Sequence, residues 1–238
     1  FVVSVGTSQS SDIRGQFFAS DGTPVAPQFT AHTSTSNTQN NPEVITLSNG
    51  NVVIAFSDFS GSSDPSSGGI IASVYAGDGT QLASDILVNS QTTSNQFGVE
   101  LVALEGGGFV ATWNDNDRTG DDSVSGTIRA QIFDNGGSKV GGEFRVNNST
   151  TSSESEQQVT ALNDGGFVIT WRDSTPSSDD SDRSAIRAQV YAADGIEIGA
   201  EILVNTSTAS FQTFPQITTL DDGGFVIAWY DSASQQYS

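Results

Sequence analysis

Apolar and polar residues alternate in short segments along this chain, and no segment keeps helical spacing over a useful length. One such segment recurs as Gly-Gly-Phe-Val-x-x-Trp at residues 107–113, 165–171 and 223–229. A degenerate copy occupies residues 50–56, and the chain begins inside a fifth copy, at residues 1–5. Because alternation with a period of two is typical of a half-buried strand, the sequence predicts a repeat protein built from strands.

The repeats have nearly constant length. Alignment on the first apolar residue of the motif gives intervals of 51, 57, 58 and 58 residues, between Phe1, Val52, Phe109, Phe167 and Phe225. After the motif strand, each repeat predicts a second strand at residues 13–18, 70–75, 128–133 and 186–191. A third follows at residues 29–32, 86–89, 144–147 and 202–205, and a fourth at residues 43–47, 100–104, 158–162 and 216–220.

Turn signals separate the second and third strands. Asp-Gly pairs begin at Asp21, Asp78 and Asp194, and the remaining repeat has Gly136-Gly137. Glycine accepts positive φ without steric cost, so these pairs predict tight hairpins.

Four antiparallel strands per repeat are typical of a β-propeller blade, and the sequence predicts an all-β, propeller-like array of about four repeats. A string of small sandwiches or a β-solenoid is the competing architecture. We expect one repeat domain over residues 1–238, with repeats at about 1–50, 51–107, 108–165 and 166–223 and a partial repeat at 224–238. The pattern leaves open whether the ring closes.

The charge balance removes several classes of partner. Lys and Arg total 8 against 28 Asp and Glu, giving a formal net charge of −20. Such a surface repels nucleic acid and anionic lipid, and it attracts cations. Apolar runs of about five residues are too short for membrane insertion. The chain has no cysteine, hence no disulfide, and with neither a start methionine nor a signal peptide it looks like a mature or excised piece.

Carboxylates gather in the loop between the first and second strands of each repeat. Two aspartates keep a six-residue separation in three of these loops. Converging carboxylates suit calcium, which takes six to eight oxygen ligands. The predicted ligands are Asp58, Asp64, Asp115, Asp117, Asp121, Asp173, Asp179 and Asp182. Solvated loop carboxylates and turn-initiating aspartates are the competing interpretation.

Arginine recurs at one position of the second strand, as Arg14, Arg129 and Arg187. These side chains could bind a loop carboxylate or a ligand carboxylate. The pattern favours an ion pair or hydrogen-bond ladder between blades.

The aromatic residues divide into two groups. Trp113, Trp171 and Trp229 recur beside valine and isoleucine, which favours packing between blades over sugar stacking. The better candidates for stacking on a glycan are Tyr230, Tyr237 and the aromatics expected in loops, Phe59, Phe97, Phe211 and Phe214.

His32, the one histidine, replaces an asparagine that recurs at the end of the third strand, so we expect a turn residue rather than a catalytic base.

The run from residue 162 to 205 contains Leu-Asn-Asp-Gly-Gly-Phe-Val-Ile-Thr-Trp, Ile-Arg-Ala-Gln-Val-Tyr-Ala-Ala-Asp-Gly and Ile-Gly-Ala-Glu-Ile-Leu-Val-Asn. It resembles the tandem repeats of very large secreted bacterial proteins that often also carry calcium-binding RTX repeats. The resemblance implies an extracellular or cell-surface setting and an adhesion or matrix role, and it brings no catalytic residues. The RTX nonapeptide itself is missing here.

We therefore expect a non-enzymatic extracellular module for adhesion or assembly, stabilised by calcium. Its expected partners are further repeats of a longer polypeptide or other copies of itself, with a cell-surface glycan as another candidate. The first alternative is a carbohydrate-binding propeller. The second is a polysaccharide hydrolase or lyase, disfavoured because similar carboxylates in three loops argue for repeated binding rather than one active site.

Overall fold

The computed structural model describes residues 5–7, 10–34, 37–64, 68–117, 126–149, 153–174, 184–206 and 211–232, and all regular structure among them is β-strand. None of these segments is a helix long and apolar enough to cross a membrane.

Three complete blades form the centre of the molecule, and each is a four-stranded sheet of antiparallel neighbours. The first contains β5 (Gln39–Thr46), β6 (Val52–Asp58), β7 (Gly69–Tyr75) and β8 (Gln81–Leu87). The second contains β9 (Gln96–Ala103), β10 (Phe109–Asp115), β11 (Thr127–Phe133) and β12 (Lys139–Arg145). The third contains β13 (Glu154–Ala161), β14 (Phe167–Asp173), β15 (Ala185–Tyr191) and β16 (Glu197–Leu203). The predicted all-β, propeller-like array is confirmed.

Two-stranded sheets lie at the two ends of the array. They join β1 (Val5–Thr7) to β2 (Ser10–Asp12), and β3 (Arg14–Gly15) to β4 (Phe29–Thr30). At the other end, β17 (Phe211–Thr219) pairs with β18 (Phe225–Ser232). Each blade thus begins with the predicted fourth strand of one repeat and continues with the first three strands of the next.

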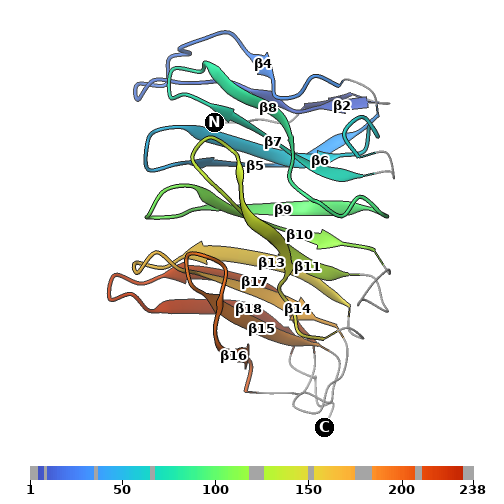
Figure 1. Ribbon diagram of the computed structural model, residues 1–238, viewed down its shortest axis with the longest axis vertical. Coiled ribbons are helices and arrows are strands. Elements are labelled where there is room, and N and C mark those ends of the chain that lie inside the picture. The colour runs from blue at the N-terminus through green and yellow to red at the C-terminus, as the bar shows by residue number, and fades with distance from the viewer. Residues whose placement is uncertain are drawn as a thin grey trace.

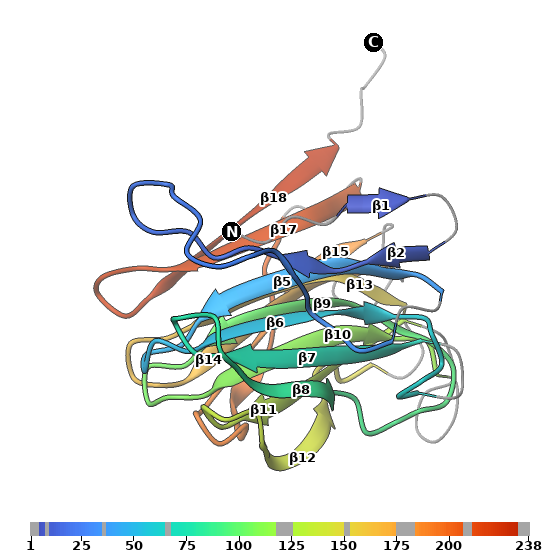
Figure 2. The same ribbon diagram turned by 90° about the horizontal axis from the view of Figure 1, so that it is seen from above.

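The blades are stacked along the long axis of the molecule, from the N-terminal pairs to the sheet of β13–β16 (Figure 1). Viewed from above, β5, β9 and β13 lie on the side that faces β17 and β18, whereas β8 and β12 lie on the opposite side (Figure 2). Successive inner strands contact one another, β5 with β9, β9 with β13 and β13 with β17. The inner strands therefore meet along a common centre.

The core lies between blades. Trp113 and Trp171 are fully buried, as predicted, and Trp113 packs in one cluster with Val53 and Ala55 of the preceding blade. Within a blade, the Phe109 ring stacks on a neighbour from the adjacent strand, Phe133, at a centroid distance of 4.7 Å. Buried apolar surface of this kind supplies about 25 cal/mol per Å², so the blades stabilise one another by stacking.

The two adjacent glycines of the motif are required for different reasons. Gly165 has φ of 90°, a conformation that favours glycine, and a Cβ there would meet nothing within 4 Å. A Cβ on Gly166 would lie 2.4 Å from the carbonyl oxygen of Tyr191. The first glycine therefore serves the turn, and the second lets two strands approach.

Candidate functional site

The structure describes five of the eight aspartates predicted to bind calcium. The described ones, Asp58, Asp64, Asp115, Asp117 and Asp173, are all buried. Asp121, Asp179 and Asp182 lie outside the described residues. The interpretation as solvated loop carboxylates is therefore wrong for the five described aspartates.

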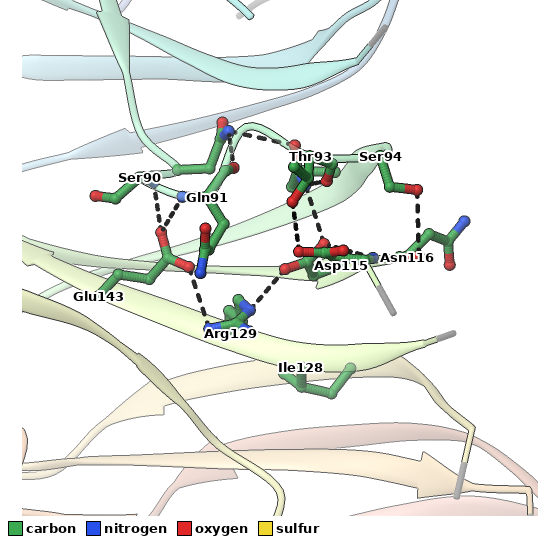
Figure 3. A network of polar contacts seen from close by, with 12 residues as sticks. Ser90, Gln91, Thr93, Ser94, Asp115, Asn116, Ile128, Arg129 and Glu143 are labelled. Carbon is green, nitrogen blue, oxygen red and sulfur yellow. Dashed lines mark hydrogen bonds and ion pairs between the residues drawn. The ribbon is translucent and has the colours of Figure 1, made fainter. Parts of the chain in front are cut away.

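Asp115 shows what the strand-end aspartates do (Figure 3). It accepts hydrogen bonds from Arg129 Nε at 2.6 Å, Gln96 Nε2 at 2.9 Å and the backbone N–H of Asp117 at 2.9 Å. These donors join three strands of one blade. Asp115 is thus a structural anchor with protein partners.

Arg129 extends this anchor to the preceding blade. Its Nη1 lies 3.4 Å from Oε1 of Glu143, and Oε2 of Glu143 accepts from the backbone N–H of Ser90 at 2.5 Å (Figure 3). We call this arrangement, Asp115–Arg129–Glu143, the blade clamp. The arginine binds carboxylates of its own blade, and the glutamate makes the contact between blades.

The clamp recurs in the next blade. Arg187 pairs with Asp173 at 3.0 Å and with Glu201 at 3.1 Å, and Glu201 accepts from the backbone N–H of Asn148 at 3.1 Å. In the first complete blade the arginine position is Ile71, and Asp58 accepts from Gln39 as Asp115 accepts from Gln96. The predicted inter-blade role of the arginines is therefore carried indirectly, through the glutamates.

Calcium binding at these loops stays a prediction. Among the residues that the structure describes, no group of three acidic or histidine side chains could hold a metal ion. Asp64 accepts from Asn89 Nδ2 at 2.9 Å, so it is also engaged by the protein.

His32 performs the role of the asparagine that it replaces. Its Nε2 accepts from the backbone N–H of Ile13 at 3.2 Å, as Asn147 Oδ1 accepts from Ile128 at 3.0 Å. The histidine is buried and structural, as predicted.

The chemically distinctive residues lie elsewhere, on the inner strands. Each inner strand shifts register near its start, which leaves residues outside the regular ladder. Two residues before each predicted start of the fourth strand, one residue has positive φ, namely Asn41, Gly98, Glu156 and Phe214. β-Bulges of this kind redirect side chains and are frequent beside active sites.

A pocket of about 360 Å³ opens over these bulges. Its lining combines the four bulge residues with polar side chains of β9, β10, β13 and β17 and two further apolar residues. Those other lining residues are Phe97, Glu100, Asn114, Gln157, Gln158, Pro215 and Gln216. A few polar groups converging in a concave site are typical of small-molecule pockets.

Glu100 is the perturbed acid of this pocket. Burial, and secondly the neighbouring carboxylate of Glu43, raise its pKa to about 7, against the opposite effect of a hydrogen bond with Gln158. Glu43 occupies the same place on β5 that Glu100 occupies on β9, and burial raises its pKa as well. Two like charges held close on adjacent strands disfavour double ionisation.

Glu156 is the second carboxylate that lines the pocket. Its Oε1 pairs with Arg172 at 3.2 Å, and its Oε2 accepts from the backbone N–H of Phe214 at 2.6 Å. Both oxygens are therefore held in place, one by its own blade and one by β17.

Amide groups fix the wall between the second and third complete blades. Asn114 Nδ2 donates to Gln157 Oε1 at 2.5 Å, and Gln157 Nε2 donates to the carbonyl of Gly98. Both side chains are buried, so the inner strands are locked together at the pocket.

Two of the predicted stacking aromatics line this pocket. Phe97 and Phe214 are 37% and 66% exposed, and they lie on β9 and β17 rather than in loops. Phe211 and Tyr230 are also exposed but do not line it. Tyr237 lies outside the described residues, and Phe59 is half-buried.

The sequence did not point to Glu43, Glu100 or Glu156 as site residues. The available signal was a break in the alternation before each fourth strand. There Glu43 and Glu100 stand where later repeats have Gln158 and Gln216.

No protein-family model matches this chain, and no curated protein matches it. Solved structures do match. A thermostable family-43 glycoside hydrolase is 11% identical with a TM-score of 0.51, over 82% of this chain and 66% of that one. An endo-1,4-β-xylanase from Bacteroides thetaiotaomicron is 8% identical with a TM-score of 0.49, over 98% of this chain and 76% of that one. An endo-arabinase from the same organism is 14% identical with a TM-score of 0.47, over 82% and 70%.

The non-enzymatic adhesion or assembly role expected from the sequence is corrected by the match with a TM-score above 0.5, because that structure is a glycoside hydrolase. At 11% identity the likeness itself shows the fold. The expectation failed because it compared loops that are alike in three repeats. The inner-strand bulges carry a different residue in each blade, and these four residues line one pocket.

Proposed function

We propose that this chain hydrolyses a polysaccharide in the inner-strand pocket, with Glu100 as general acid and Glu156 as the second carboxylate. The observation that carries the proposal is a carboxyl group with a pKa of about 7 that shares an open pocket with a second, fixed carboxylate. The likeness to a family-43 glycoside hydrolase concerns the fold, so the chemistry rests on these residues.

Glycoside hydrolysis needs a pair of carboxyl groups in different protonation states. With a pKa of about 7, Glu100 keeps its proton at neutral pH and can donate it to the glycosidic oxygen as the bond breaks. Glu156 is oriented by Arg172 and by the Phe214 N–H, and it would activate the attacking water or attack the anomeric carbon. Glu43 acts on the reaction through Glu100, as a positioning residue that keeps the acid protonated.

The test is release of reducing sugar from arabinan and xylan. We expect Glu100→Gln and Glu156→Gln each to lower kcat by about 100-fold or more, since positioned acid–base groups contribute that much. Glu105→Gln, a change at an exposed turn residue, is the control and should leave kcat unchanged.

For the wild type, the rate should fall as pH rises through 7 and Glu100 loses its proton. If kcat is unchanged in Glu100→Gln and Glu156→Gln, the assignment of these two residues is overturned.

A carbohydrate-binding role is the second candidate, favoured by the exposed rings of Phe97 and Phe214 in the same pocket. Binding of a glycan without release of reducing sugar would support it over hydrolysis. The extracellular setting implied by the repeat resemblance agrees with either function, and we retain it as part of the proposal.

A further inference from the structure

Four residues occupy one structural position on the four inner strands, and all four have positive φ. The angles are 52° for Asn41, 67° for Gly98, 57° for Glu156 and 55° for Phe214. Glycine adopts this conformation freely, and asparagine is several-fold enriched in it. A bulky aromatic residue there is an outlier, so Phe214 is the strained member of the set.

Packing of the Phe214 side chain in the core does not offset the backbone strain at this residue. The Phe214 side chain is 66% exposed, so its ring contributes little buried area to the fold. Residues that persist in sparsely populated backbone regions cluster at ligand sites, where surrounding structure holds them.

The surrounding structure does hold Phe214. Its backbone N–H donates to Glu156 Oε2 at 2.6 Å, Glu156 pairs with Arg172, and the following residue, Pro215, is buried. The ring is therefore presented at the pocket from a fixed backbone. Ordering it on binding costs less than ordering a mobile side chain.

We propose that Phe214 and Phe97 form a stacking subsite for an uncharged sugar ring at the mouth of the inner-strand pocket. Both rings line the pocket and are exposed. Aromatic faces offer rigid apolar contact to the C–H face of a sugar, while Gln158 and Gln216 offer hydrogen bonds to its hydroxyl groups.

Charge selects the kind of sugar. The described residues that line the pocket include Glu100 and Glu156 but no lysine or arginine. Glu100 keeps its proton at neutral pH, so a uronate would meet like charge from the Glu156 carboxylate and from a chain of formal net charge −20. The subsite therefore fits neutral polysaccharides. This inference rests on the proposed function, because it names the substrate class of the same pocket.

Relief of strain gives a readout that separates a binding role from a structural one. Phe214→Gly and Phe214→Asn remove the ring and suit the observed φ. We expect either change to leave the Tm unchanged or to raise it, and to weaken binding of xylan and arabinan oligosaccharides by about 3- to 10-fold. Phe97→Ala should weaken binding similarly. The control is Phe211→Ala. Phe211 is exposed and lies on β17, as Phe214 does, but it does not line the pocket, so this change should not alter affinity.

Affinity is measured by calorimetry in the Glu100→Gln background, so that binding is independent of turnover. Polygalacturonate, the charged probe, should bind at least tenfold more weakly than the neutral probes. Retained binding with no hydrolysis by the wild type would remove the proposed activity and leave the subsite in place.

Three results would overturn the subsite. The first is an unchanged affinity in Phe214→Gly, and the second is no measurable binding of either neutral probe. The third is a large fall in Tm for Phe214→Gly, which would show that the ring is structural.

Discussion

Glu43 and Glu100 occupy the same position on successive inner strands, and the pKa of Glu100 is raised first by burial and then by the Glu43 carboxylate. The repeat itself creates the pair, because the same position of successive blades faces the same centre. The third complete blade and β17 have the uncharged residues Gln158 and Gln216 at this position, so they add no carboxylate that would repel Glu100. The two described inner-strand acids with a raised pKa, Glu43 and Glu100, therefore lie on neighbouring inner strands in one part of the array.

Stability should decrease between pH 4.5 and 7 because of Glu100. Its pKa is about 7 in the folded protein against 4.5 ordinarily, so in this interval the folded state binds a proton that the unfolded chain releases. The contribution is full below pH 4.5 and disappears as pH rises through 7. After solvent screening it amounts to about 1–2 kcal/mol. Urea unfolding at several pH values measures it; Glu100→Gln should flatten the pH dependence, and Glu105→Gln should preserve it.

The blade clamp should be a major contributor to stability. Arg129→Ala leaves two buried carboxylates, Asp115 and Glu143, without their cation. Breaking one partner of a buried charge network costs about 3–5 kcal/mol. The matched control is Arg14→Ala, whose pair with Asp12 spans 3.6 Å at a more exposed site and should contribute about 0–1 kcal/mol. Equal unfolding midpoints for the two variants in urea would contradict the clamp's role.

The second glycine of the motif should be essential only where a neighbouring strand covers it. Gly166→Ala would place Cβ 2.4 Å from a carbonyl oxygen of β15. We expect a loss of about 2–4 kcal/mol, as for other overpacked positions. At Gly224, the nearest atom to a Cβ is Asp222 Oδ1 at 3.2 Å, so Gly224→Ala should cost about 1 kcal/mol or less. Thermal melts of the two variants make the comparison, which fails if the order is reversed.

Calcium remains to be tested at the loops between the first two strands of each repeat. If calcium binds only the folded state, saturation at a hundredfold over Kd stabilises by about 2.7 kcal/mol. Removing it with a chelator should then lower the Tm by about 5–10 °C for a chain of this size. Calcium should restore the midpoint, and an equal concentration of magnesium should not, since the two ions differ in ligand number and geometry. A midpoint unaffected by the chelator contradicts the prediction.

Local pattern was enough to predict much of the fold. Alternation located the strands, Asp-Gly pairs located the hairpins, and a tryptophan at one position in three copies of the motif indicated packing between blades. The inner strands, however, begin four or five residues earlier than alternation suggested, at Gln39 rather than Glu43 in the first complete blade and at Phe211 rather than Gln216 in β17. A bulge inserts residues that interrupt a period of two, so the pattern was hidden where the strand changes direction.

The candidate site was less accessible from sequence. Glu100 and Glu156 belong to different repeats, and only the meeting of inner strands places them in one pocket. The loop aspartates attracted attention because they recur, yet Asp115 and Asp173 recur for a structural reason, as anchors for arginine. The aspartate–arginine pair recurs in two blades because it holds the strands of each blade together, and the proposed site uses residues that differ between blades.

The bulge on each inner strand also affects how such a chain can evolve. One backbone position accepts an amide, a hydrogen atom, a carboxylate and a phenyl ring at nearly the same φ, while the ladder on either side keeps its register. Substitution there changes what one blade presents at the centre, and at Glu156 it also changes the contact with the Phe214 N–H of the next inner strand. A protein built this way can acquire a new ligand preference one blade at a time, and the same four positions are where a designer would graft one.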